Sequence, residues 1–195
     1  MNQNNTSSVP KLGAPGAGIP AIERFVAKRM IFWKARRTSR EAALNLFLME
    51  RGLILQLLES TKPDLLATRV LIKRLAGLED SSRYWSLLMT LDHLRIVNKQ
   101  ITEVIESLCA GRPVPLVAST AAVKPSEQVD ATVIQAFEKA CGDFENVVST
   151  HDNLRTNLKF AHPWFGPMDA GEWQFMVAFH MALHRKQMEL IIRGL

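Results

Sequence analysis

Cysteine, proline and glycine are scarce in this sequence. Its two cysteines, Cys109 and Cys141, lie far apart and in no metal-binding or redox spacing, which favours reduced thiols over a disulfide framework. The nine prolines and ten glycines include several of each before residue 21, so the rest of the chain has few helix breakers. Because that remainder is rich in Leu, Ala, Met, Arg and Glu, the composition favours an all-helical domain.

Long apolar runs are also missing. No charge-free segment reads as a membrane span, and the N-terminal stretch MNQNNTSSVPKLGAPGAGIP lacks the apolar region of a secretory signal. With the reduced thiols, this predicts a soluble, cytoplasmic protein. The formal net charge is +5, with several positive residues between Lys28 and Arg40. Since no aromatic-basic recognition motif accompanies them, we interpret a solvated basic face and expect no specific nucleic-acid partner.

The chain divides into three parts by composition. Residues 1–20 are polar and then rich in Gly, Pro and Ala, which predicts a disordered tail. Residues 21–37 predict a short basic amphipathic helix that packs on the domain or contacts a partner; its basic flank leaves binding to a membrane surface as an alternative, and we favour packing. Residues 38–195, in a chain that is 47% hydrophobic and 22% charged, are enough for one domain with a real core.

Helical periodicity defines four long segments within residues 38–195. They run from a capping box at Thr38–Glu41 to about Ser60, from Ser86 to Leu108, from about Glu127 to Leu158, and from an N-cap at Asp169 almost to Leu195. A shorter helical piece is expected from Asp64 to Leu75. The sequence therefore predicts an all-α four-helix bundle, a fold whose metal sites are built from side chains facing inward from different helices.

The last predicted helix carries His180 and His184 four residues apart. This spacing stacks two imidazoles on one helix face, where they can bind one metal ion in adjacent coordination positions. Met181, Leu183 and Met188 lie close by, so two buried histidines bonded to the backbone would fit the same pattern. On the pair alone both interpretations stand, and a metal would need a third ligand from another helix.

A second motif resembles a known family. Trp85-Ser86 followed by His93-Leu94 is similar to the W-S-x6-H-L element of DinB/YfiT-like proteins. The C-terminal HPWFGPMDAGEW, followed by His180, His184 and Gln187, resembles a branch of that superfamily with an H-P-x-F-G-x-L element, then W, H, H and Q. The resemblance covers roughly residues 38–195; one departure is Leu183, where that branch often carries an additional histidine.

The resemblance implies a divalent metal bound by His93, His180 and His184. Three neutral imidazoles leave a coordination position open, as in catalytic sites, and Zn²⁺, Ni²⁺ or Fe²⁺ would accept them. It implies a metal-dependent hydrolase or thiol-dependent transferase acting on a small-molecule substrate. The alternative is a non-catalytic bundle that serves as a binding or dimerisation module, for instance as a homodimer.

The loop before the last helix offers further candidates. His162 either contacts substrate as an acid or base over the bundle mouth, or bonds nearby backbone groups. Trp164 and Phe165 either line a pocket or plug the bundle end. Gly166 is expected to allow a positive-φ turn. Asp92, beside His93 but on another face of its helix, is expected to be solvated.

Overall fold

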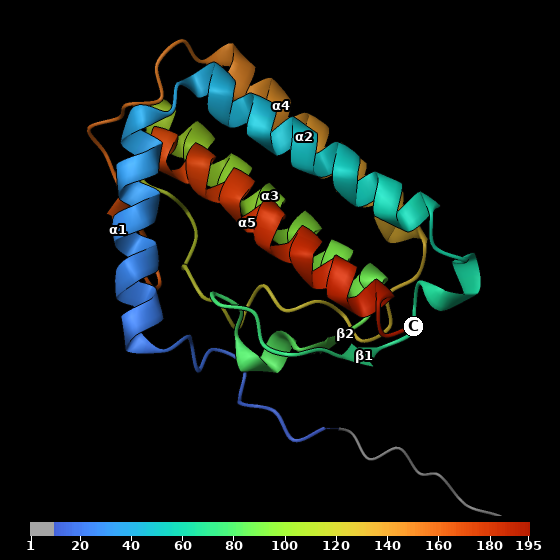
Figure 1. Ribbon diagram of the computed structural model, residues 1–195. Coiled ribbons are helices and arrows are strands. Elements are labelled where there is room, and N and C mark those ends of the chain that lie inside the picture. Colours follow the sequence, from blue (N-terminus) through green and yellow to red (C-terminus); the bar gives the residue numbers. More distant parts are fainter. Residues whose placement is uncertain (1–9) are drawn as a thin grey trace, which may run out of the picture.

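The computed structural model describes residues 10–195 and contains five α-helices in that range (Figure 1). The helices are α1 (Ala21–Arg37), α2 (Arg40–Glu59), α3 (Leu87–Cys109), α4 (Thr132–Thr150) and α5 (Ala170–Ile192). Two 3-10 turns, Pro63–Leu65 and Asp80–Ser82, and four short strands complete it: β1 (Val70–Leu71), β2 (Tyr84–Trp85), β3 (Phe160–His162) and β4 (Gly166–Met168).

Helices α2 to α5 form the predicted four-helix bundle, and α1 crosses it steeply near one end (Figure 1). The apolar stripes of the four helices meet in one continuous core. Phe47 of α2 and Phe144 of α4, both fully buried, pack against each other with ring centroids 4.3 Å apart. Helix α3 is buried along most of its length, which makes it a rigid support for the side chains it carries.

The helix caps follow sequence chemistry with one correction. Ser39, not Thr38, is the N-cap of α2, and its hydroxyl accepts a hydrogen bond from the Ala42 amide. The Thr38 hydroxyl instead donates to the Lys34 carbonyl at the end of α1. Asp169 and Glu172 form the complete capping box that begins α5, so the Glu172 carboxylate has a capping role.

Two predicted helical segments differ in the structure. The Asp64–Leu75 piece contains only one 3-10 turn and then β1, because Val70 pairs with Trp85 in an antiparallel ladder. Helix α4 is shorter than the predicted Glu127–Leu158, since Asp130 accepts from the Thr132 amide at its start. Residues after Thr150 pack on neighbouring elements instead: the Leu154 carbonyl accepts from the Gly171 amide at 2.7 Å.

Strands β3 and β4 form a hairpin that sequence periodicity did not predict. His162 pairs with Gly166, and residues 163–165 make the turn between them. Gly166 has φ +79°, as expected, which only glycine adopts at little cost. The hairpin holds His162, Trp164 and Phe165 at the end of the bundle.

Helix α1 packs against the bundle through a narrow face. Ile31 and Ala35 are its buried residues, whereas Ile22, Phe25 and Trp33 remain more than half exposed. Its predicted apolar face is therefore only partly covered by the bundle.

The segment before α1 falls within the predicted disordered tail. The prediction for residues 1–9 lies outside the described residues. Residues 10–20 differ from it: the Gly13 amide donates to Asp80 at 2.7 Å, and the Gly18 amide donates to Glu79 at 2.9 Å. These bonds fasten the segment to the loop before β2. We call residues 13–20 the N-terminal strap.

Candidate metal centre and its cavity

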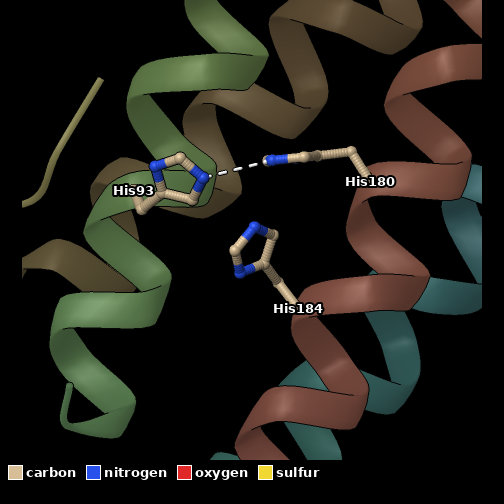
Figure 2. Close-up of side chains that lie close together, drawn as sticks. All are labelled: His93, His180 and His184. Atoms are coloured by element: carbon tan, nitrogen blue, oxygen red, sulfur yellow. Dashed lines mark hydrogen bonds between the residues drawn. The ribbon is translucent and has the colours of Figure 1, made fainter. Parts of the chain in front are cut away.

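The three histidines singled out by sequence lie together between α3 and α5. Ser86 caps α3 by accepting from the Met89 amide, and His93 lies about two turns further along. His180 and His184 come from successive turns of α5, which packs directly on α3. Figure 2 shows the three rings turned toward one another. The helix pair thus supplies the third imidazole that the HxxxH spacing required.

Distances within the cluster suit a single ion. One ligand nitrogen from each histidine lies within 4.8 Å of the others. The Nε2 atoms of His93 and His180 are 3.1 Å apart, close to the roughly 3.3 Å expected between two nitrogens that share a tetrahedral Zn²⁺. The residues present therefore fit a divalent ion bound by three imidazoles.

Neighbouring groups fix the orientation of two of the three rings. His93 Nδ1 lies 2.6 Å from the Val123 carbonyl, and His184 Nδ1 lies 2.7 Å from Oε1 of Gln187. Both partners are acceptors, so each Nδ1 donates its proton and each Nε2 keeps its lone pair for the cluster. The Gln187 amide is itself oriented, because its Nε2 donates to the Ser82 carbonyl at 2.7 Å.

His180 differs from the other two. Its Nδ1 is buried and has no hydrogen-bond partner among the described residues. A buried polar atom without a partner is uncommon and indicates a missing water, ion or ligand.

Burial keeps the cluster neutral at pH 7. Desolvation lowers the pKa of His93 to about 4, although its hydrogen bond to the Val123 carbonyl raises the pKa in part. The pKa values of His180 and His184 are lowered well below the ordinary value, first by desolvation and then by the neighbouring histidines. Neutral imidazole is the form that binds metal.

Trp85 forms a wall of the cluster. Its ring stacks on His184 with an interplanar angle of 14° and also contacts His93 at 5.2 Å between centroids. The Lys124 ammonium lies 5.4 Å from the Trp85 ring centroid. The tryptophan of the W-S motif therefore packs the histidine rings in place, a role that its position in the sequence did not reveal.

A cavity of about 440 Å³ opens from the three histidines. Helices α1, α3 and α5, the loop between α3 and α4, and the β3–β4 hairpin all contribute to it. Its walls are mainly apolar, and Leu183 lines it beside the cluster. A cavity of this size suits a small organic molecule.

His162 lines the same cavity but lies outside the histidine cluster. Its Nδ1 accepts a hydrogen bond from the Trp164 amide at 3.1 Å, and its ring stacks on Phe165 at 4.5 Å between centroids. His162 therefore bonds nearby backbone, and its place in the cavity lining keeps contact with a substrate as a prediction. Trp164 and Phe165 line the pocket.

Sequence reasoning missed the residues supplied by the loop between α3 and α4. Val123 and Lys124 gave no signal, because a backbone carbonyl is invisible in sequence and a single lysine is common. Gln187 could have been assigned from its spacing, since residues three apart share a helix face. Asp92, expected to be solvated, is buried; it pairs with Arg95 and accepts from the Ser126 amide, which anchors the same loop.

The buried histidines predict acid sensitivity of the metal-free protein. His93 and His162 each have a folded-state pKa of about 4 because of desolvation, against roughly 6.5 when unfolded. Between these values the unfolded chain binds more protons, so stability falls as the pH decreases from about 6.5 to 4. We expect His162 alone to account for a loss of about 1–2 kcal/mol between pH 7 and pH 5.

Urea unfolding at both pH values in the presence of a chelator measures this loss. His162→Asn keeps an acceptor near the position of Nδ1 but cannot titrate. The loss of unfolding free energy between pH 7 and pH 5 should therefore be about 1–2 kcal/mol smaller in this variant than in the wild type. His151→Asn, at the end of α4 and outside the cavity, is the matched control. An unchanged pH dependence in His162→Asn would contradict the prediction.

Together these observations define a class: a helical bundle in which three neutral imidazoles, two buried and one partly buried, come from two helices and line a mainly apolar cavity. The DinB superfamily model matches residues 74–188, more than half of the chain. The chain belongs to the DinB superfamily, as its W-S and HxxxH elements suggested.

Comparison with solved structures supports the same fold. The chain is similar to TT2238, described as a four-helix bundle protein in its crystal structure, with a TM-score of 0.56 and 20% sequence identity. The match covers 77% of this chain and 98% of that one. At this identity the likeness shows the fold alone. Among the curated proteins no match was found. In the part of the chain that is described, none of the helices has the length and apolarity needed to cross a membrane.

Proposed function

We propose that this protein binds one divalent metal ion through His93, His180 and His184 and uses it to act on a small-molecule substrate. The observation that carries the proposal is the convergence of three neutral imidazoles at the end of a mainly apolar cavity. Membership of the DinB superfamily supports it. Zn²⁺, Ni²⁺ and Fe²⁺ all accept imidazole ligands.

The reaction class we favour is metal-dependent hydrolysis or thiol-dependent transfer. A divalent ion with an open position lowers the pKa of water, polarises a carbonyl or holds a thiolate. The chain's own residues would set the conditions for this chemistry: Val123 and Gln187 hold two rings in the binding tautomer, while the apolar walls exclude water from the substrate.

Metal content and turnover of tag-free protein test the proposal together. We expect near-stoichiometric metal after exposure to Zn²⁺, Ni²⁺ or Fe²⁺, and turnover of an ester, an amide or a thiol with an electrophile. Chelator-treated protein is the control and should lose both. Absence of bound metal after exposure to all three ions would mean that the histidines are structural, and metal-loaded protein without turnover across the panel would exclude the enzyme.

A second candidate function is a non-catalytic binding or dimerisation module. Leu46, Met49 and Leu53 lie on one face of α2 and are 40%, 51% and 37% exposed. Apolar residues spaced three and four apart can form a helix-to-helix contact between two copies of the chain. Analytical ultracentrifugation, combined with the turnover assay, distinguishes the two candidate functions. A monomer with robust turnover would count against the binding or dimerisation module.

The location that we propose is cytoplasmic. Both cysteines are free thiols: Cys141 is buried and Cys109 is partly buried. Unpaired cysteines suit a reducing compartment.

A further inference from the structure

The cavity is lined mainly by apolar side chains, including Ile101, Val104, Leu116, Trp164 and Met176, and the histidine cluster forms part of the same lining. A few other polar side chains also line it, among them Glu23, Gln100, Ser119 and Thr120. Mainly apolar walls bind apolar surface and offer few hydrogen-bond partners to a sugar, a nucleotide or a peptide backbone. The shape and chemistry together favour a ligand with an apolar body and one polar group.

A divalent ion at the histidine cluster would favour a ligand oxygen with full or partial negative charge. Three neutral imidazoles would leave the charge of a bound divalent ion uncompensated. The nearby carboxylates already have partners: Glu79 pairs with Lys124, and Asp92 pairs with Arg95. A carboxylate on the ligand would therefore supply the missing negative charge, and the carbonyl oxygen of an ester or amide would supply a partial one. Either oxygen would also lie near His180, whose Nδ1 is the unpartnered atom of the cluster.

The cavity opens to solvent beside α1 and the loop between α3 and α4, where exposed apolar residues line it. Ile22 and Val26 of α1 and Val117 of the loop between α3 and α4 line the cavity, yet they are 79%, 57% and 90% exposed. Side chains that both line the cavity and contact solvent mark its mouth. An apolar mouth lets a hydrocarbon chain enter without loss of hydration of polar protein groups.

We propose that the cavity takes a medium-chain amphiphile, a fatty acid or its ester or amide, with the head at the three histidines and the chain toward α1. This inference rests on the proposed function, because the preference for an oxygen head depends on the bound ion. The volume of about 440 Å³ would hold about fifteen non-hydrogen atoms at roughly 30 Å³ each. Decanoate is within that limit.

Calorimetric titration with decanoate tests the inference on metal-loaded protein whose metal content is measured in the same sample. We expect saturable binding of one decanoate per chain with a negative heat-capacity change. Each methylene removed from the ligand should weaken binding by about fourfold. Decan-1-ol should bind at least about tenfold more weakly than decanoate to metal-loaded protein, and this difference should shrink after chelation.

Two variants test whether decanoate binds in this cavity. Ala27 of α1 lines the cavity and is half-buried, so Ala27→Phe should fill it and weaken decanoate binding by at least about tenfold. Ala42→Phe, at an exposed position of α2, is the control. Val117→Glu adds a negative charge at the exposed mouth and should weaken binding by about threefold at low salt, whereas Leu46→Glu on α2 should not.

The outcomes separate this inference from the proposed function. Bound metal with no decanoate binding, or binding that Ala27→Phe leaves unchanged, overturns the inference and leaves the metal site intact. Decanoate binding that Ala27→Phe abolishes in a protein that takes up no metal supports the apolar ligand and overturns the proposed function. Equal affinity for decanoate and decan-1-ol in metal-loaded protein overturns the assignment of the head group.

Discussion

Replacement of His180 by alanine is expected to weaken metal binding by more than about a hundredfold. Removal of a residue that only orients a metal ligand already lowers metal affinity by about 10–100-fold, and His180 is a proposed ligand itself. The variant should still fold. In the metal-free protein the Nε2 atom of His180 lies 3.1 Å from His93 Nε2, so the substitution leaves that buried acceptor of His93 without a partner. We expect the free energy of unfolding of metal-free His180→Ala to fall by about 1–3 kcal/mol.

Competition with a chromophoric chelator measures the affinity, and chemical denaturation measures the stability. His162→Asn is the control for a cavity histidine outside the cluster and should keep the metal. Gln187→Ala should fall between the two, since Gln187 only orients His184. Metal affinity unchanged in His180→Ala would show that the ion, if bound, lies elsewhere.

Replacement of Glu79 by alanine is expected to destabilise the protein by about 3–5 kcal/mol, the usual cost of removing one partner of a buried ion pair. Glu79 is 4% exposed, and its carboxylate bonds the Lys124 ammonium at 2.6 Å. The same carboxylate accepts from the amides of Gly16 and Gly18. It therefore joins the N-terminal strap to the loop between α3 and α4, two walls of the cavity.

The ionised form of Glu79 is the one that makes these contacts. Burial raises its pKa, but the hydrogen bond and charge of Lys124 outweigh burial and lower the pKa below its ordinary value. Glu79 thus contributes stability above the unfolded-state pKa, and this contribution is lost as the pH falls through the lower, folded-state pKa. Glu79→Ala removes it at neutral pH.

Thermal or urea unfolding gives the global effect, and hydrogen exchange of the Gly16 and Gly18 amides gives the local one. We expect faster exchange at both glycines in Glu79→Ala. The Glu79→Ala/Lys124→Ala double variant should lose less unfolding free energy than the two single variants lose together, because it leaves no buried charge unpaired. Asp143→Ala, which breaks an exposed pair with Lys139 on α4, is the matched control and should change stability by less than about 1 kcal/mol. A similar small effect in Glu79→Ala would contradict this account.

Helices with strong local signals were predicted well. Helix α3 begins after the Ser86 cap and ends near Leu108, and α5 begins after the Asp169 capping box, as their sequences indicate. Both combine a capping side chain with a long apolar stripe, so local preference and burial favour the same structure. Their order and the breakers between them were enough to predict the four-helix bundle.

Segments without such agreement were predicted poorly. The residues after Asp64 have helical spacing, yet Val70 pairs with Trp85, and the backbone bonds of this strand pair replace those of a helix. The predicted end of α4 at Leu158 fails because Leu154 is buried and its carbonyl bonds the start of α5. In both cases a partner distant in sequence decides the local conformation.

The sequence by itself determined which residues could share a site: His180 and His184 lie on one face because a helix repeats every 3.6 residues. The family resemblance added His93. Tertiary structure alone decided the rest, because packing α3 on α5 sets the distances between nitrogens and the α3–α4 loop brings Val123 to His93. The cavity likewise exists only when α1, that loop and the β3–β4 hairpin surround the histidines. Contacts between segments far apart in sequence depend on burial in the assembled fold, which no local pattern encodes.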